Sequence, residues 1–188
     1  VISTGAGGLG VAARDSATFS GTNTVTTLGV NLTGSGASLN YTNTGPLIIG
    51  TVTTIGGLTT SNGHVTVSAN GGLTVNHGVA SGSGTVNFLS SGAARIILNP
   101  NLPTPGGDVI LRAPNAGVAQ TGGRISAGAG GLGVAARHGV TFPGANTVRT
   151  LGVNLSEPGA GVLFVNNGPL IIGTVTSIGG VTTNGGGV

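Results

Sequence analysis

The chain has no cysteine, methionine, tryptophan or lysine, and only 5% of its residues are charged. The absence of cysteine excludes disulfide bonds and thiolate metal sites. With no lysine, one glutamate and one glutamine, few exposed helix positions could be filled by good helix formers, so we expect no helical fold. No apolar run approaches the roughly 18 residues of a membrane-spanning helix, and no N-terminal stretch has the pattern of a signal peptide.

Glycine and aliphatic residues dominate instead. Glycine contributes 40 of the 188 residues, and 38% of the chain is hydrophobic. Disordered segments are less hydrophobic and more charged, and a collagen would show a strict glycine period, so neither class fits. The apolar residues form short runs separated by Gly, Asn, Ser and Thr, which predicts short strands and tight turns. The pI of about 11.3 rests on six scattered arginines, so it does not predict a nucleic-acid partner.

The most informative pattern is a long repeat without gaps. Residues 1–65 align with residues 124–188 at a constant offset of 123, with roughly two-thirds of the positions identical. The stretch GAGGLGVAAR at 5–14 recurs unchanged at 128–137. A unit that repeats without insertions is expected to stack on its neighbours, which indicates an array rather than an enzyme.

A shorter period lies inside the long one. Strand-like starts fall at intervals of 18–23 residues, at Leu9, Leu28, Leu47, Val65, Val86, Val109, Leu132, Leu151 and Leu170. This spacing predicts an all-β fold, a β-solenoid of about nine to ten coils of 18–23 residues, and it disfavours a β-sandwich and a leucine-rich repeat. We expect residues 1–188 to form a single solenoid segment that is part of a longer array.

The same pattern predicts the residues of the stacked core. They are the first and third residues of most of the apolar runs: Leu9, Val11, Leu28, Val30, Leu47, Ile49, Val65, Val67, Val86, Phe88, Val109, Leu111, Leu132, Val134, Leu151, Val153, Leu170 and Ile172.

Two stretches carry a resemblance to a known family. Residues 63–88 (GHVTVSANGGLTVNHGVASGSGTVNF) and 106–134 (GGDVILRAPNAGVAQTGGRISAGAGGLGV) resemble the repeats of filamentous-haemagglutinin-type exoproteins, which are bacterial surface adhesins exported by two-partner secretion. The resemblance lies in the recurrence of Gly-Gly, Val-x-Val and Asn over nearly the whole chain. It implies a right-handed parallel β-helix, export from a Gram-negative bacterium, and adhesive or fibre-forming work. It brings no catalytic residues, and the family's amino-terminal secretion domain is not recognisable here.

A glycine motif of the nucleotide-binding kind occurs twice, at Gly5, Gly7, Gly8 and Gly10 and again at Gly128, Gly130, Gly131 and Gly133. A dinucleotide site would need a helix after the glycines and an acidic residue about 20 positions further on. Neither follows, so we interpret these glycines as solenoid corners and expect no cofactor.

The chain offers few residues for catalysis or metal binding. Its only acids are Asp15, Asp108 and Glu157, too few to expect a carboxylate pair of the glycosidase type. The three histidines, His64, His77 and His138, are too few and too far apart in sequence to predict a metal site. We expect all three on the outer wall. We therefore expect no enzyme and no catalytic or metal site.

Arg14 and Arg137 are the only charged residues present in both copies of the repeat. They are candidates for a partner contact, although a solvated arginine whose stem covers apolar wall is the simpler interpretation. Asparagines at 23, 31 and 43 recur at 146, 154 and 166, which fits turn positions or a stacked amide ladder. Threonine-rich runs at 22–29, 50–60 and 173–183 raise the hypothesis of an ice-binding face.

These observations lead to one functional expectation with one alternative. The first is a structural shaft of a secreted or cell-surface bacterial fibre or adhesin, built by coil stacking and end-to-end or lateral contacts with itself or with further repeats. The alternative is a module whose wall binds glycan, a host protein or ice. We expect no nucleic acid and no membrane span. Because only one Tyr and four Phe are present, a stacking platform for sugars is not evident.

Overall fold

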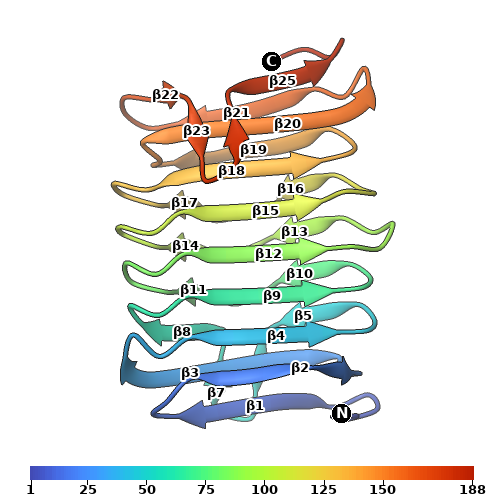
Figure 1. Cartoon of the computed structure of the whole chain (residues 1–188), viewed down its shortest axis with the longest axis vertical. Helices are drawn as coiled ribbons and strands as arrows, with labels where there is room; N and C mark the ends of the chain where they lie inside the picture. The colour runs from blue at the N-terminus through green and yellow to red at the C-terminus, as the bar shows by residue number, and fades with distance from the viewer.

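A computed structural model describes all 188 residues, and it contains strands and no helix. The chain winds into a parallel β-solenoid of about 8 turns, drawn in Figure 1 as a rod with its ends at opposite extremes. The near strands run left to right and the far strands right to left while the chain climbs, so the coil is right-handed (Figure 1). No part of the chain forms a helix that could cross a membrane.

One sheet, which we call the front wall, holds nine strands in parallel pairing. Successive turns of the chain each add one row to it, so its strands are far apart in sequence but adjacent in space. They are β2 (Ala17–Asn23), β4 (Leu39–Asn43), β9 (Val65–Ala69), β12 (Val86–Ser90), β15 (Val109–Ala113), β18 (Gly131–Ala136), β20 (Thr150–Pro158), β22 (Ile171–Ile172) and β25 (Val181–Asn184).

The opposite sheet, the back wall, holds ten strands. They are β1 (Gly8–Ala13), β3 (Thr27–Ser35), β5 (Leu47–Ile49), β8 (Leu58–Ser61), β10 (Leu73–Val75), β11 (Val79–Ala80), β13 (Ile96–Leu98), β16 (Val118–Gln120), β19 (Val140–Asn146) and β21 (Val162–Asn166). A separate short pair, β14 (Leu102–Pro103) and β17 (Ile125–Ser126), continues the line of β8 and β11.

Two small antiparallel hairpins interrupt the coils. They are formed by β6 (Thr51–Val52) with β7 (Ile55–Gly56), and by β23 (Thr174–Val175) with β24 (Ile178–Gly179). Each lies between two short strands that pair with the same long neighbour: β5 and β8 both pair with β3, and β22 and β25 both pair with β20. Each hairpin is therefore an insertion in the middle of one row.

The coils are longer and fewer than the sequence pattern suggested. Strand pairing joins Leu9 to Leu28 and Val65 to Val86, steps of 19 and 21 residues, but Leu39 to Val65, a step of 26. The long step contains the hairpin β6–β7. The spacing of strand starts missed this because Leu47 lies on the back wall and Val65 on the front wall, so that interval is not one coil. The chain makes about 8 turns rather than nine to ten.

The 123-residue offset does not correspond to a whole number of turns. From β1 to β18 the chain crosses between the walls eleven times, which is five and a half turns. Consequently β1 and β3 lie in the back wall, whereas their repeats β18 and β20 lie in the front wall. The two copies of the repeat present the same surface on opposite sides of the rod.

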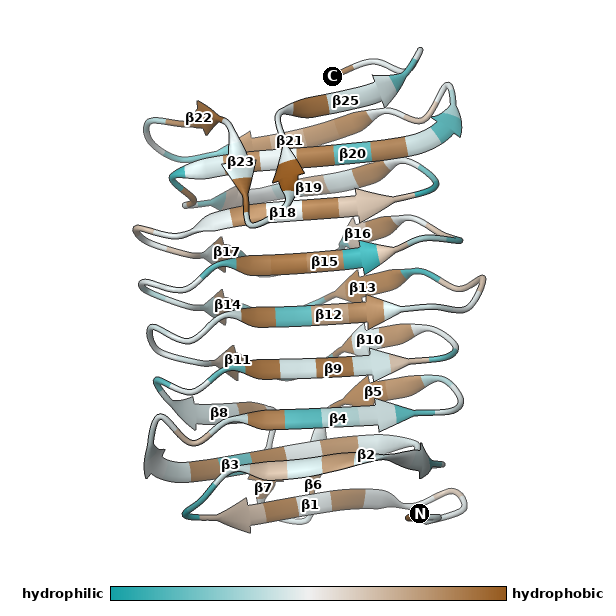
Figure 2. Ribbon diagram, viewed as in Figure 1, coloured by the Kyte–Doolittle hydropathy of each residue, from teal (hydrophilic) through white to brown (hydrophobic).

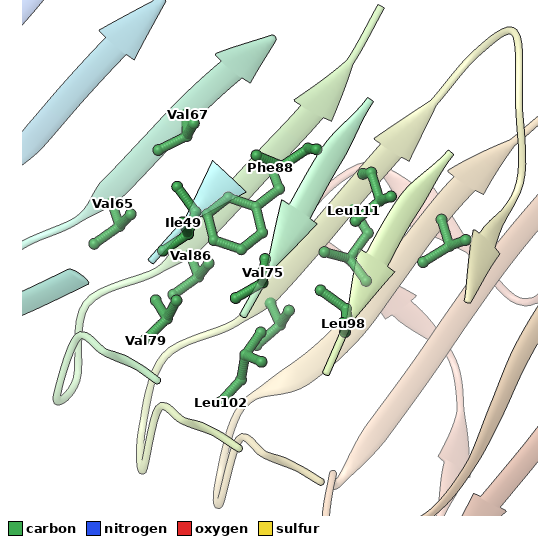
Figure 3. Close-up of a cluster of buried hydrophobic side chains, with 14 of the residues drawn as sticks. Ile49, Val65, Val67, Val75, Val79, Val86, Phe88, Leu98, Leu102 and Leu111 are labelled. Carbon is green, nitrogen blue, oxygen red and sulfur yellow. The ribbon is translucent and has the colours of Figure 1, made fainter. Parts of the chain in front are cut away.

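The core is a single column of aliphatic side chains between the walls. It contains 40 buried residues, and Figure 3 shows part of it: Phe88 lies in line between Val67 and Leu111 of the neighbouring rows, and its ring points toward Ile49 and Val75. Fourteen of the predicted core residues lie in it; Leu9, Val11 and Leu170 are partly buried against it. Ile172 differs from the expectation, because it is 54% exposed on β22, which has no strand beyond it.

Buried amides close the turns between the walls. The Asn43 side chain accepts a hydrogen bond from the Val25 N–H at 2.9 Å and donates to the Val25, Gly45 and Pro46 carbonyls. The side-chain amides of Asn146 and Gln120 donate hydrogen bonds to each other. No buried side-chain nitrogen or oxygen lacks a partner, which is what a water-free interior requires. Both roles expected for these asparagines occur, because the buried Asn23, Asn43 and Asn146 lie at turns and their amides also form hydrogen bonds from coil to coil. Asn31 and Asn154 are exposed.

Candidate functional site

The repeated glycine motif forms the seat of a hairpin. Gly8 and Gly10 lie within β1, and a Cβ on Gly8 would approach Val52 of the hairpin β6–β7 to 2.7 Å. In the second copy, a Cβ on Gly131 would approach Val175 of the hairpin β23–β24 to 2.5 Å. Real Cβ atoms do not come this close to other atoms, so only glycine lets the hairpins lie flat on the wall.

This arrangement corrects the interpretation of the motif as corner residues. Gly5, with a φ of 58°, is at a turn, but Gly8 and Gly10 are in a strand under the hairpin. The motif runs into β1 and β18 rather than into a helix, so it has no helix N-terminus of the kind that holds a pyrophosphate. Its chemistry is packing: Val175 and Ile178 are buried with Ile110 in a small apolar cluster outside the main core.

The carboxylates are dispersed along the rod. Asp15 is exposed at the turn after β1, and Asp108 accepts a hydrogen bond from the Gly131 N–H at 2.8 Å. Glu157 lies 2.6 Å from the Arg137 guanidinium, and that hydrogen bond holds the pKa of the Glu157 carboxyl below its ordinary value. No three acidic, histidine or cysteine side chains come together as metal ligands would.

The three histidines are exposed and lie outside the strands. The ring of His64 accepts a hydrogen bond from the Thr85 N–H at 3.0 Å, between adjacent rows. His77 lies against the hairpin β6–β7, with its Nδ1 3.4 Å from the Thr51 hydroxyl. These contacts fasten coils and the hairpin to each other.

The two repeated arginines have different surroundings. Arg137 forms an ion pair with Glu157, whereas Arg14 has Gly34 in the place of that glutamate. The backbone contact is the same in both copies. The Gly34 N–H donates to the Arg14 carbonyl, and the Glu157 N–H donates to the Arg137 carbonyl, both at 2.8 Å. Both side chains are exposed, so they remain available as partner contacts.

A shallow groove on the front wall brings apolar, polar and charged side chains together. It crosses four rows and has aliphatic side chains on either side of Arg112, whose Nη1 donates to Asn87 at 2.9 Å. The hairpin β23–β24 stands over neighbouring β18 and β20. The groove is lined by Leu89, Arg112, Pro114, Ala135, Ala136, Asn154 and Ser156. Sequence reasoning missed it, because its residues align only once the coils are stacked.

The threonine-rich runs do not form one flat threonine face. Thr53 and Thr54 lie in the turn of the first hairpin, and Thr60 is buried with its hydroxyl donating to the Gly63 carbonyl. Thr24 and Thr44 do stack, with their hydroxyl oxygens 3.1 Å apart, at the edge of the rod. The regular threonine rows that motivated the ice-binding hypothesis are therefore divided among hairpin, core and edge.

No protein-family model, no curated protein and no solved structure matches the chain.

Proposed function

We propose that this chain is a length of structural shaft from a secreted or cell-surface bacterial fibre or adhesin, resembling the filamentous-haemagglutinin type. The observation that carries the proposal is the uninterrupted stacking of both walls around one core of 40 buried residues. Each coil is held by its neighbours above and below, so strength along the axis comes from backbone pairing rather than from a local site. The proposal gives the chain no catalytic role.

The outermost rows support a role in end-to-end assembly. The strands β21 and β22 each have a neighbour on one side only, and Ile171 and Ile172 of β22 are more than half exposed. An open edge of this kind pairs readily with another strand. The occupant that fits is a further coil, from another copy or from additional repeats.

Lengthening the chain in phase with the repeat tests the shaft. Since Val188 is equivalent to Val65, appending residues 66–188 after Val188 continues the solenoid without a break. We expect the lengthened chain to melt at a higher temperature and to form longer rods in electron micrographs, because stability in stacked repeats grows with the number of interfaces. The matched control appends residues 76–188, which places strands where turns belong. Equal melting temperatures for the original and in-phase chains would contradict the shaft.

The front-wall groove supports a second candidate, a module that binds a glycan or host protein. Arg112 uses one Nη for Asn87 and keeps its other N–H donors for a ligand beside an apolar floor. Binding to host cells or glycans that is lost on Arg112→Ala, but kept on Arg95→Ala elsewhere on the rod, would favour this candidate over a purely structural role.

A further inference from the structure

The outer face of the back wall carries a row of aliphatic and threonine side chains along the rod axis, which we call the ridge. Strand register places one residue of each row in line from β5 to β21. The members are aliphatic or carry a threonine methyl, and none is charged. The ridge consists of Ile48, Thr74, Ile97, Ala119, Thr141 and Leu163, the last of which is 52% exposed.

A column made mostly of glycines lies beside the ridge. The residue two places before each ridge position is Gly72, Gly117, Gly139 or Gly161 in four rows, with Pro46 and Arg95 in the other two. Backbone bonds hold this column in line, as from the Leu47 N–H to the Gly72 carbonyl at 2.9 Å. Because the glycines have no side chains, the wall is hollowed next to Thr141 and Leu163 into a shallow groove.

The other flank of the ridge is polar in its middle rows, and the polar groups there bond to one another. The Asn99 amide donates to Asn76, and the Thr121 hydroxyl bonds to Asn99, so these groups form a ladder along the axis. Polar groups that already have partners cost less to remove from water than free ones. Arg95 is the only charged residue in the three columns.

We propose that the ridge and the glycine column form a lateral contact between two copies of this chain, lying side by side. A second copy is the occupant that fits, because its ridge has the same spacing of about 4.8 Å per row and can enter the column where its residues are glycine, above all in the hollow beside Thr141 and Leu163. The proposal rests on the shaft function and specifies how shafts would bundle.

The geometry also sets the orientation of the pair. The ridge and the groove are neighbours on one wall, so each ridge meets the other groove only if the rods are parallel and related by a two-fold axis along their length. The hairpin β6–β7 follows Ile49 and Gly50, on the side of the ridge away from the glycine column, and leaves the groove open. On the front wall, the hairpin β23–β24 covers β18 and β20.

The size of the contact predicts a weak pair. Six rows at about 4.8 Å span roughly 24 Å, a smaller strip than the ~800 Å² per partner of a stable interface. Association should therefore depend on concentration at this length and strengthen as coils are added in register.

Two threonines in one coil provide a matched test. Thr74 is in the ridge and Thr66 faces outward from the front wall; both are partly buried. In sedimentation experiments on the full chain over a range of concentrations, we expect Thr74→Arg to weaken dimerisation at least 10-fold and Thr66→Arg to leave it unchanged. Circular dichroism melting checks that both variants fold. Thr141 is exposed, so Thr141→Arg provides a second ridge variant that leaves the interior unchanged.

The same experiments distinguish the lateral contact from other modes of association. A chain that is monomeric at every concentration, or equal weakening by Thr74→Arg and Thr66→Arg, overturns the lateral contact. Association that is lost in Ile172→Arg but kept in Thr74→Arg also overturns it, in favour of end-to-end pairing through β22. Cross-linking decides orientation: a short thiol reagent should join two copies of Thr74→Cys, and joining Thr74→Cys to Leu163→Cys instead would contradict parallel rods. The melting of lengthened chains tests the shaft independently of all these results.

Discussion

Residues 1–65 and 124–188 are close copies in sequence, but the fold places them on opposite faces of the rod. The hairpin of the first copy covers glycines of the back wall, and the hairpin of the second covers glycines of the front wall. The local sequence therefore determines that a hairpin forms and that it packs on glycines. The number of half-turns between the two copies determines on which wall of the rod the hairpin lies. A surface carried by this repeat alternates between the two sides of the rod.

The two hairpins also differ in how well they are packed. Val175 and Ile178 are only 3% and 6% exposed, whereas Val52 and Ile55 are partly exposed. The reason is the row below the seat: Ile110 of β15 packs against the second hairpin, and β1 has no row below it. Two hairpins of nearly the same sequence are thus packed to different extents by the coils around them.

The largest difference is expected for the equivalent phenylalanines of the two copies. Phe142 is fully buried, while Phe19 is partly exposed with Tyr41 on one side only. Phe142→Ala should lower the free energy of unfolding by about 3–5 kcal/mol, and Phe19→Ala by roughly half as much. Urea denaturation of both variants measures this. Equal losses would show that the end row is packed as tightly as the interior.

A smaller difference is expected in the hairpins. Ile178→Ala should cost about 2–3 kcal/mol and Ile55→Ala about 1 kcal/mol, because only the former leaves a closed cavity. Adding Ile110→Ala to each variant sharpens the comparison: we expect a coupling of about 0.5 kcal/mol or more with Ile178 and none with Ile55. Coupling of Ile110 to both hairpins would contradict the packing described for the second copy alone.

A third difference distinguishes Tyr41 from its equivalent Phe164 and appears only at alkaline pH. Burial raises the pKa of Tyr41 from 10.0 to about 12, so the folded chain keeps a proton that the unfolded chain releases. Stability should be intact below pH 10 and fall as the pH rises from 10 to about 12. The chain has no lysine or cysteine to mask this loss. Melting curves of Tyr41→Phe should lack the decline; an identical decline would assign it to another cause.

Much of the fold could be predicted because its signals are local. The alternation in runs such as Val65 to Ala69 marks inward and outward side chains, and the long repeat demands stacking. The wall to which each strand belongs could not be predicted, because Leu47 and Val65 look alike in sequence but lie on opposite walls. The hairpins were missed for a related reason: TVTTIG reads as strand, and only the pairing of β5 and β8 with one neighbour reveals an insertion.

The sequence by itself determined an all-β stacked rod and an aliphatic core, since these follow from composition and period. Only the tertiary structure decided the count of about 8 turns, the opposite faces of the two copies and the alignment of Ile48 to Leu163 into a ridge. These features depend on register between coils about 20 residues apart. Register is fixed by the summed pairing and packing of whole rows, and no single stretch of sequence contains it.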